Sequence, residues 1–139
     1  MTDNLTKEQR KKNMRAIKSQ STLENKVTKD LWRLGFRFRK NANLYGKPDI
    51  SIKKYKIVIF IDSCFWHYCP VHGNMPKSNK DYWEKKLERN IQRDIEVNQY
   101  YIDKGWNILR VWEHDLKENP IETTNLIENF IRENKKKYL

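Results

Sequence analysis

Apolar residues recur every three or four positions in three segments of the chain, as they do on the buried face of an amphipathic helix. The first segment covers residues 21–34, where Ser21 followed by Glu24 has the spacing of a capping box. The second covers residues 81–103. The third begins with Pro120, a residue that favours the first helical position. The pattern therefore predicts a helix at each of these three places.

Four other segments are typical of strands. Residues 36–40 alternate apolar and basic side chains, and residues 49–52 form a short run of alternating type. Residues 57–61 are continuously apolar and rich in β-branched side chains, as in a central strand that is covered on both faces. The last strand is expected at residues 106–112, and the chain end at residues 135–139 is expected to fray.

The resulting order, α-β-β-β-α-β-α, predicts one α/β domain over residues 21–139. Short connections between the first three strands favour an antiparallel meander. The long helix between the last two strands makes those strands parallel neighbours with a right-handed crossover. We therefore expect a mixed central sheet that is flanked by helices on both faces.

The charge of the chain indicates a polyanionic partner. The 139 residues include 29 Lys and Arg against 18 Asp and Glu, a net charge of +11, which suits nucleic acid or an anionic membrane surface. No apolar run reaches the roughly 20 residues that cross a bilayer, and no apolar signal segment is present, so we expect a cytoplasmic protein without a membrane partner. Residues 1–20 are predicted to form a basic arm that contacts DNA through Met14, Arg15 and Lys18, with a frayed terminus as the alternative.

Both cysteines and two of the three histidines lie in one short segment. Cys64, Cys69 and His72 have the spacing of zinc ligands, and a closed tetrahedral site needs a fourth. His114 follows one of the two parallel strands and Cys64 follows the other, so both should emerge at the same sheet edge. These four residues are predicted to bind a structural Zn²⁺. His67 stays open as an alternative fourth ligand, and buried thiols beside ordinary histidines are the alternative to a metal site.

Two acidic residues lie at the ends of neighbouring predicted strands. Asp49 follows Pro48 at the start of one strand, and Asp62 ends the next. Carboxylate oxygens on adjacent strands suit Mg²⁺, which can then also hold a phosphate group. The pattern predicts a catalytic Mg²⁺ site, with an ordinary turn at the Pro-Asp pair as the alternative.

Several of these motifs together resemble one known family. The segments GKPDI, VIFIDSCFWHYCPVHG, YWEKKLERNIQRD and GWNILRVWEHDL, together with NMRAIKSQSTLE near the start, resemble the very-short-patch-repair (Vsr) mismatch endonucleases over about residues 13–116. The resemblance implies a restriction-endonuclease-like fold. It also implies an Mg²⁺-dependent enzyme that nicks DNA on the 5′ side of the T in a T·G mismatch, the product of 5-methylcytosine deamination.

The resemblance also implies a set of metal ligands. Asp49 would be the primary Mg²⁺ ligand, and the backbone carbonyl of Ile61 would face the same metal. Glu24 would bind the metal through water, and Asp62 is an additional candidate contributor. The histidine at position 114, where a cysteine can stand in the family, keeps the zinc site intact because either side chain binds zinc.

The remaining implied roles concern proton transfer and the mismatch. His67 would act as the general base or position the attacking water, and Asp94 would orient it. Phe65, Trp66 and Trp83 would wedge into the base stack beside the mismatch, where a wobble pair is easier to unstack than a matched pair. The helical spacing fits a core role for Trp83 equally well.

Two other functions remain open from the sequence. A non-catalytic, zinc-stabilised DNA-binding module would account for the charge and the Cys/His segment, and a related nuclease could have a different specificity. The favoured interpretation is a monomeric, nucleoid-associated mismatch endonuclease that acts on double-stranded DNA, with mismatch-repair helper proteins as further partners.

Overall fold

The computed structural model describes residue 7, residues 22–63 and residues 79–138. Among the described residues, no helix is long and apolar enough to cross a membrane. Several predicted site residues lie outside the described residues, namely Met14, Arg15, Lys18, Cys64, Phe65, Trp66, His67, Cys69 and His72.

The centre of the described fold is a four-stranded mixed sheet in the order β1-β2-β3-β4. Strands β1 (Arg39–Lys40), β2 (Ile50–Ile52) and β3 (Ile57–Asp62) form the antiparallel meander that the sequence predicts. Strand β4 (Asn107–Trp112) pairs with β3 in parallel, with Ile57 opposite Asn107 and Asp62 opposite Trp112. The predicted crossover between parallel neighbours is therefore confirmed.

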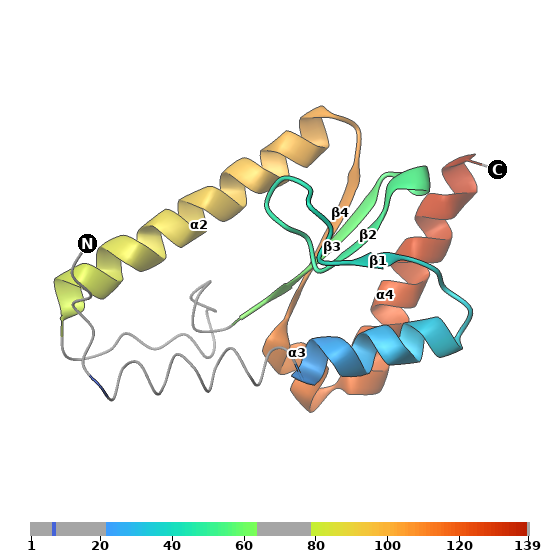
Figure 1. Ribbon diagram of the computed structural model, residues 1–139, viewed down its shortest axis with the longest axis horizontal. Helices are drawn as coiled ribbons and strands as arrows, with labels where there is room; N and C mark the ends of the chain where they lie inside the picture. Colours follow the sequence, from blue (N-terminus) through green and yellow to red (C-terminus); the bar gives the residue numbers. More distant parts are fainter. Residues whose placement is uncertain (1–6, 8–21, 64–78, 139) are drawn as a thin grey trace.

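Helices cover both faces of this sheet (Figure 1). The long helix α2 (Lys80–Asp103) covers one face, and the helix at residues 22–33 covers the other together with α4 (Pro120–Lys135). A mixed sheet between two helical layers is an α/β fold, and it fits the expected restriction-endonuclease-like architecture.

Strand β3 determines which face each neighbouring side chain joins, because side chains alternate along a strand. Its odd-numbered isoleucines pack into the cluster formed with residues 22–33 and α4. Val58 and Phe60 pack instead against Val97 and Tyr101 of α2. Asp62 is in phase with Phe60, so its carboxylate faces the α2 side of the sheet.

The structure differs from the sequence-based expectations at residues 36–40 and at the chain end, and it adds two short elements. The predicted strand at 36–40 pairs only at Arg39–Lys40, because Phe36 is buried in the cluster with α4. A short 3-10 helix, η1 (Lys53–Tyr55), connects β2 to β3, and an additional helix that the pattern did not predict, α3 (Glu113–Glu118), precedes α4.

The chain end was expected to fray and is ordered instead. It forms a 3-10 helix, η2 (Lys136–Tyr138). The ring of Tyr138 packs edge-on against Tyr55 with the ring centres 5.9 Å apart, and Lys137 Nζ donates a hydrogen bond to Asn107 Oδ1 at 3.0 Å. These contacts with η1 and β4 hold the tail against the domain.

Candidate active site

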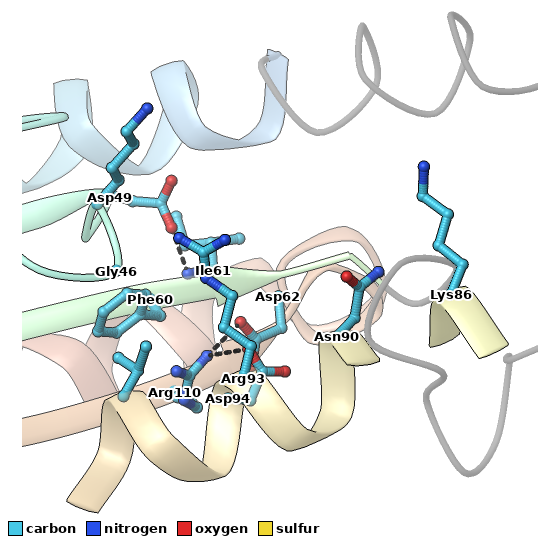
Figure 2. Close-up of a pocket in the computed structure, with 12 residues that line it drawn as sticks. Gly46, Asp49, Phe60, Ile61, Asp62, Lys86, Asn90, Arg93, Asp94 and Arg110 are labelled. Atoms are coloured by element: carbon cyan, nitrogen blue, oxygen red, sulfur yellow. Dashed lines mark hydrogen bonds and ion pairs between the residues drawn. The ribbon is translucent and has the colours of Figure 1, made fainter. Parts of the chain in front are cut away.

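The carboxylate of Asp49 is the centre of the candidate active site. Asp49 directly precedes β2, after a turn in which Gly46 and Lys47 both have positive φ angles of 75° and 51°. Its Oδ2 accepts a hydrogen bond from the backbone N–H of Ile61 on β3 at 2.6 Å (Figure 2). The turn and the neighbouring strand therefore hold the half-buried carboxylate in one position.

The surroundings of Asp49 disfavour its negative charge. Burial is the largest effect and raises the pKa of Asp49 from 3.8 to about 7, although the Ile61 N–H acts in the opposite direction. A hydrogen bond and charge repulsion from Glu24 raise it further, and repulsion from Asp62 adds a smaller contribution. Asp49 and Glu24, predicted from sequence as members of one metal site, are therefore in contact. Such a pair is stabilised by a shared proton or by a cation.

The backbone of Ile61 belongs to the same site. The N–H and the C=O of one residue in a strand point to the same side of that strand. Because the Ile61 N–H points at Asp49, the Ile61 carbonyl oxygen also faces the Asp49 side of β3. This orientation agrees with the backbone role that was expected for Ile61.

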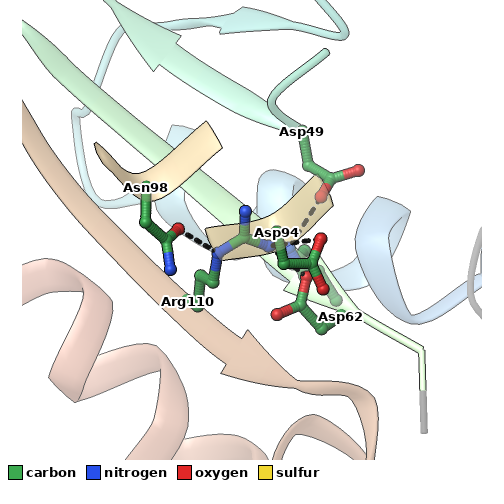
Figure 3. Close-up of polar contacts among 6 residues, drawn as sticks. Asp49, Asp62, Asp94, Asn98 and Arg110 are labelled. Atoms are coloured by element: carbon green, nitrogen blue, oxygen red, sulfur yellow. Dashed lines mark hydrogen bonds and ion pairs between the residues drawn. The ribbon is translucent and has the colours of Figure 1, made fainter. Parts of the chain in front are cut away.

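Asp62 points away from Asp49 and is paired with an arginine. Its side chain is 8% exposed, and Arg110 on β4 donates a hydrogen bond to Asp62 Oδ1 at 2.9 Å. Arg110 Nη1 also lies 3.6 Å from Asp94 Oδ1, and Arg110 Nε donates to Asn98 Oδ1 at 2.6 Å (Figure 3). Asp62 and Asp94, both predicted site residues, are thus joined by one guanidinium.

Arg110 is one of the cationic members of the site that the motif-based predictions missed, together with Lys47, Lys86 and Arg93. Its guanidinium stacks over Phe60, with the central carbon 4.3 Å from the ring centre, and its side chain is 18% exposed. The sequence did contain a signal, because Arg110 interrupts the apolar run from Ile108 to Trp112 in a half-buried strand. An arginine in such a strand needs acidic partners.

The acids and several cations surround one cavity of about 390 Å³. Figure 2 shows the acidic groups of the Gly46–Asp49 turn and β3 opposite the charged side chains of α2. The acids that line the cavity are Asp49, Asp62 and Asp94, and the cations are Lys47, Lys86, Arg93 and Arg110. A hollow with carboxyls beside cations can hold a phosphate group together with a divalent cation.

Among the described residues, no three His, Cys, Asp or Glu side chains gather closely enough to hold a metal ion by themselves. This finding is compatible with Mg²⁺, which commonly binds one or two carboxylates and takes its other oxygens from water, backbone and phosphate. The metal-binding atoms near Asp49 that the described residues supply are oxygens, and oxygens suit Mg²⁺ better than a softer metal.

Two further predicted residues are described. His114 lies in the first turn of α3, directly beyond β4, and its ring stacks on Trp112 with the ring centres 6.3 Å apart. Trp83 of α2 is fully buried, which agrees with the core alternative. Its contact with DNA stays a prediction, as do the roles of the site residues outside the described ranges.

Comparisons with known proteins agree on one family. The sequence model of the family described as DNA mismatch endonuclease Vsr matches residues 2–72. The Type II nicking enzyme V.HpaIIP of Haemophilus parainfluenzae is 46% identical over 136 residues, which cover 94% of this chain and 96% of the relative. The Type II nicking enzyme V.NmeDIP of Neisseria meningitidis serogroup C is 41% identical over 135 residues, with 94% and 91% covered. The DNA mismatch endonuclease Vsr of Escherichia coli K12 is 36% identical over 120 residues, with 84% and 77% covered. The chain therefore belongs to the Vsr family of DNA mismatch endonucleases.

Proposed function

We propose that this Vsr-like DNA endonuclease nicks one strand of duplex DNA on the 5′ side of the T in a T·G mismatch and depends on Mg²⁺. The observation that carries the proposal is the Asp49 carboxyl, which is held by the Ile61 N–H beside Glu24 and has a pKa raised to about 7 mainly by burial. Carboxylates with a structural role normally have partners that stabilise their negative charge. Asp49 and Glu24 instead repel each other, so a bound cation would stabilise the ionised pair.

The residues that would hold Mg²⁺ are Asp49, the Ile61 carbonyl and, through water, Glu24. When bound there, the metal would polarise the scissile phosphate and stabilise the leaving oxygen. Asp62 is not needed as a ligand, since its carboxylate is already paired with Arg110. Its charge still contributes to the negative potential at Asp49.

The cations of the cavity would bind the phosphodiester backbone. Lys47 comes from the turn before Asp49, and Lys86 and Arg93 come from α2 on the opposite wall. Cations on both sides can position one phosphate between the carboxyl pair and α2. Water would then attack the phosphorus in line with the bond that breaks.

Proton transfer would involve His67, with Asp94 as the carboxylate that orients it. Asp94 is itself held near Arg110 at 3.6 Å, which fixes it on the cavity side of α2. An imidazole that is oriented by a fixed carboxylate keeps one tautomer and can accept a proton from water. Phe65 and Trp66 are proposed to unstack the mismatched step.

A duplex with one T·G pair, labelled on each strand in turn, tests the proposed reaction. We expect one nick, 5′ of the mismatched T, with Mg²⁺ and none with EDTA. The matched duplex should remain intact. Equal inactivity on every duplex, with DNA binding retained, would instead support the non-catalytic module.

Asp49→Ala tests the metal site directly. It should reduce nicking by at least about a thousandfold, as expected when the group that anchors a catalytic metal is lost, and it should keep DNA binding. Asp103→Ala is the matched control, because Asp103 lies at the far end of α2 and contacts Gln99. Normal nicking by Asp49→Ala would exclude the proposed metal ligand.

A nicking enzyme with a different target is the second candidate. Two of the three relatives described above carry the name Type II nicking enzyme, and that name specifies no mismatch. The same assay separates the two functions when the T·G pair is placed in several flanking sequences beside matched duplexes. Nicking of a matched sequence would favour the second candidate.

A further inference from the structure

We infer that a groove between the helix at residues 22–33 and strand β1 is a second DNA-contact surface, which binds the duplex flank on one side of the cut. The inference rests on the proposed function, because it assigns the neighbouring cavity to the scissile phosphate. The groove has a volume of about 560 Å³ and lies outside that cavity. Its lining consists of Asn25, Thr28, Lys29, Trp32, Arg33, Phe38 and Lys40.

The charges of the groove suit a polyanion. Three of its lining residues are cations, Lys29, Arg33 and Lys40, and none is acidic. Arg37 and Arg39 lie beside them on the exposed edge of the sheet. A row of cations without acids is the usual feature of a surface that binds phosphates.

An exposed tryptophan gives the groove an aromatic wall. Trp32 is 49% exposed, and its ring contacts Phe38 edge-on with the ring centres 5.8 Å apart. The guanidinium of Arg37 stacks 3.9 Å above the Trp32 ring.

The same guanidinium is anchored to the backbone. Arg37 Nη1 donates to the carbonyl oxygens of Trp32 at 3.0 Å and Phe36 at 2.9 Å. Both bonds use Nη1, so among the described residues Nε and Nη2 of Arg37 have no hydrogen-bond partner. A guanidinium held in this way can bind a phosphate with little loss of side-chain freedom.

The groove begins next to the candidate active site. Lys40 Nζ donates to Asn25 Oδ1 at 2.7 Å, and Asn25 follows Glu24, which contacts Asp49. The neighbouring Asn41 N–H donates to the Asp49 carbonyl at 3.1 Å. One continuous surface therefore leads from the proposed cut to the groove.

The length of this surface predicts the length of DNA that it contacts. From Glu24 to Arg33 the helix advances by nine residues, or about 13.5 Å at 1.5 Å per residue. Duplex DNA rises about 3.4 Å per base pair, so this distance corresponds to about four base pairs. The groove should contact a flank of about that length on one side of the nick.

The test measures equilibrium binding of the full chain to T·G duplexes in EDTA, so that the readout is independent of cleavage. The groove variant is Lys29→Ala/Arg33→Ala, in which both side chains are exposed on a helix. The control variant is Lys53→Ala/Lys54→Ala, in which two exposed lysines are removed from η1, outside the lining of the groove. Circular dichroism and thermal unfolding should show that both variants fold like the parent.

The plot of log affinity against log salt has a negative slope, and removal of two phosphate contacts should make this slope less steep by about 1.8. The loss of affinity between 50 and 200 mM salt should then be about twelvefold smaller than for the parent chain. The control variant should keep the parent slope. An unchanged slope in the groove variant, or an equal change in the control, would overturn the inference.

Duplexes shortened stepwise from either end test the position of the flank. The parent should lose affinity when one flank falls below about four base pairs. The groove variant should bind the long and the short duplex equally on that side. If the variant responds to shortening as the parent does, the groove does not bind the flank. Absence of T·G nicking by the parent would instead contradict the proposed function. Because binding is measured in EDTA, without cleavage, the role of the groove and the nicking activity are tested separately.

Discussion

Asp49 is held in a position where its ionised form is unfavourable, and the protein should therefore become less stable as this residue ionises. The pKa is about 7 in the folded chain against 3.8 for the free side chain, mainly because of burial. An acid whose pKa is raised by folding reduces stability as the pH rises from its unfolded pKa to its folded pKa. The reduction is complete above about pH 7 and absent below about pH 4.

Asp49→Asn should remove this pH dependence, because an amide does not ionise. The amide oxygen can still accept the hydrogen bond from the Ile61 N–H, so the local structure should be kept. Without Mg²⁺ the variant should be more stable than the parent at pH 8, on the order of 2–4 kcal/mol. The difference should shrink steadily toward pH 4. Urea unfolding at several pH values measures it, and a difference that does not change with pH would contradict the raised pKa. Mg²⁺ should stabilise the parent and not the variant if the carboxylate binds it.

Arg110 is the residue that keeps two acids ordered beneath the cavity. Arg110→Met retains the aliphatic stem over Phe60 and leaves the buried Asp62 without its cation. We expect a loss of about 2–4 kcal/mol in stability, because removing one partner of a buried ion pair is costly, and slower nicking because Asp94 is less well held. The second change Asp62→Asn should restore part of the stability, and a double-mutant cycle measures the coupling.

Arg132→Met is the matched control for Arg110→Met. Arg132 forms an ion pair with Glu128 at 2.9 Å on the surface of α4, and its side chain is 55% exposed. Its loss should change stability by no more than about 0.5 kcal/mol. Equal effects of the two substitutions would show that the Arg110 pair is no stronger than a surface pair.

Part of the site at this scale could be predicted from sequence and part could not. The Pro-Asp pair before a strand identified Asp49, and the family resemblance added Glu24. Arg110 was missed because its partner Asp62 is 48 positions away and no short motif joins them. Only the pairing of β3 with β4 brings these two residues together.

At the scale of the elements, the turn before β2 packs against α2 at a position where only glycine fits, Gly46. Gly46 has a φ of 75°, and a Cβ at this position would lie 2.7 Å from Val97 Cγ1 of α2. Gly46→Ala should therefore combine backbone strain with a clash and lower the stability by about 2–4 kcal/mol. It should also lower nicking, because the turn positions Lys47 and Asp49.

Gly105→Ala is the control that separates strain from the clash. Gly105 also has a φ of 75°, but a Cβ there would meet nothing within 4 Å. Its substitution should cost about 1 kcal/mol from backbone strain alone. Thermal unfolding of the two variants gives the comparison, and equal losses would mean that the contact between the turn and α2 is unimportant.

Long, strongly periodic elements were predictable and short ones were not. The predicted helix at 81–103 and the predicted strand at 57–61 differ from α2 and β3 by one residue at one end. Helix α3 has six residues and no side-chain cap, so neither periodicity nor a start signal marked it. Elements of this length depend on contacts with the rest of the chain.

At the scale of the whole molecule, the topology collects the site at one edge of the sheet. Asp49 precedes β2, Asp62 ends β3, and α3 begins where β4 ends. Because β2 runs antiparallel to β3 while β4 runs parallel to it, all three positions meet at the same edge. The strand pairing therefore brings Asp49, Asp62 and Arg110, which are far apart in the sequence, to one cavity.

The same topology supports the proposed structural zinc site. Asp62 and Trp112 are paired at the ends of β3 and β4. Cys64 and His114 each follow two residues later in the sequence, and His114 lies in the first turn of α3 at this edge. We propose that Zn²⁺ binds Cys64, Cys69, His72 and His114, and so links the segment after β3 to the segment after β4.

Metal analysis of the purified chain should find one zinc per molecule. His114→Ala should lose the zinc and lower the melting temperature by about 10 °C or more, because a structural zinc site contributes directly to folding. His67→Ala should keep both the zinc and the parent melting temperature while nicking is lost. The opposite pattern, with zinc lost from His67→Ala and retained in His114→Ala, would make His67 the fourth ligand. The proposed general base would then be wrong, since an imidazole bound to zinc cannot also accept a proton from water.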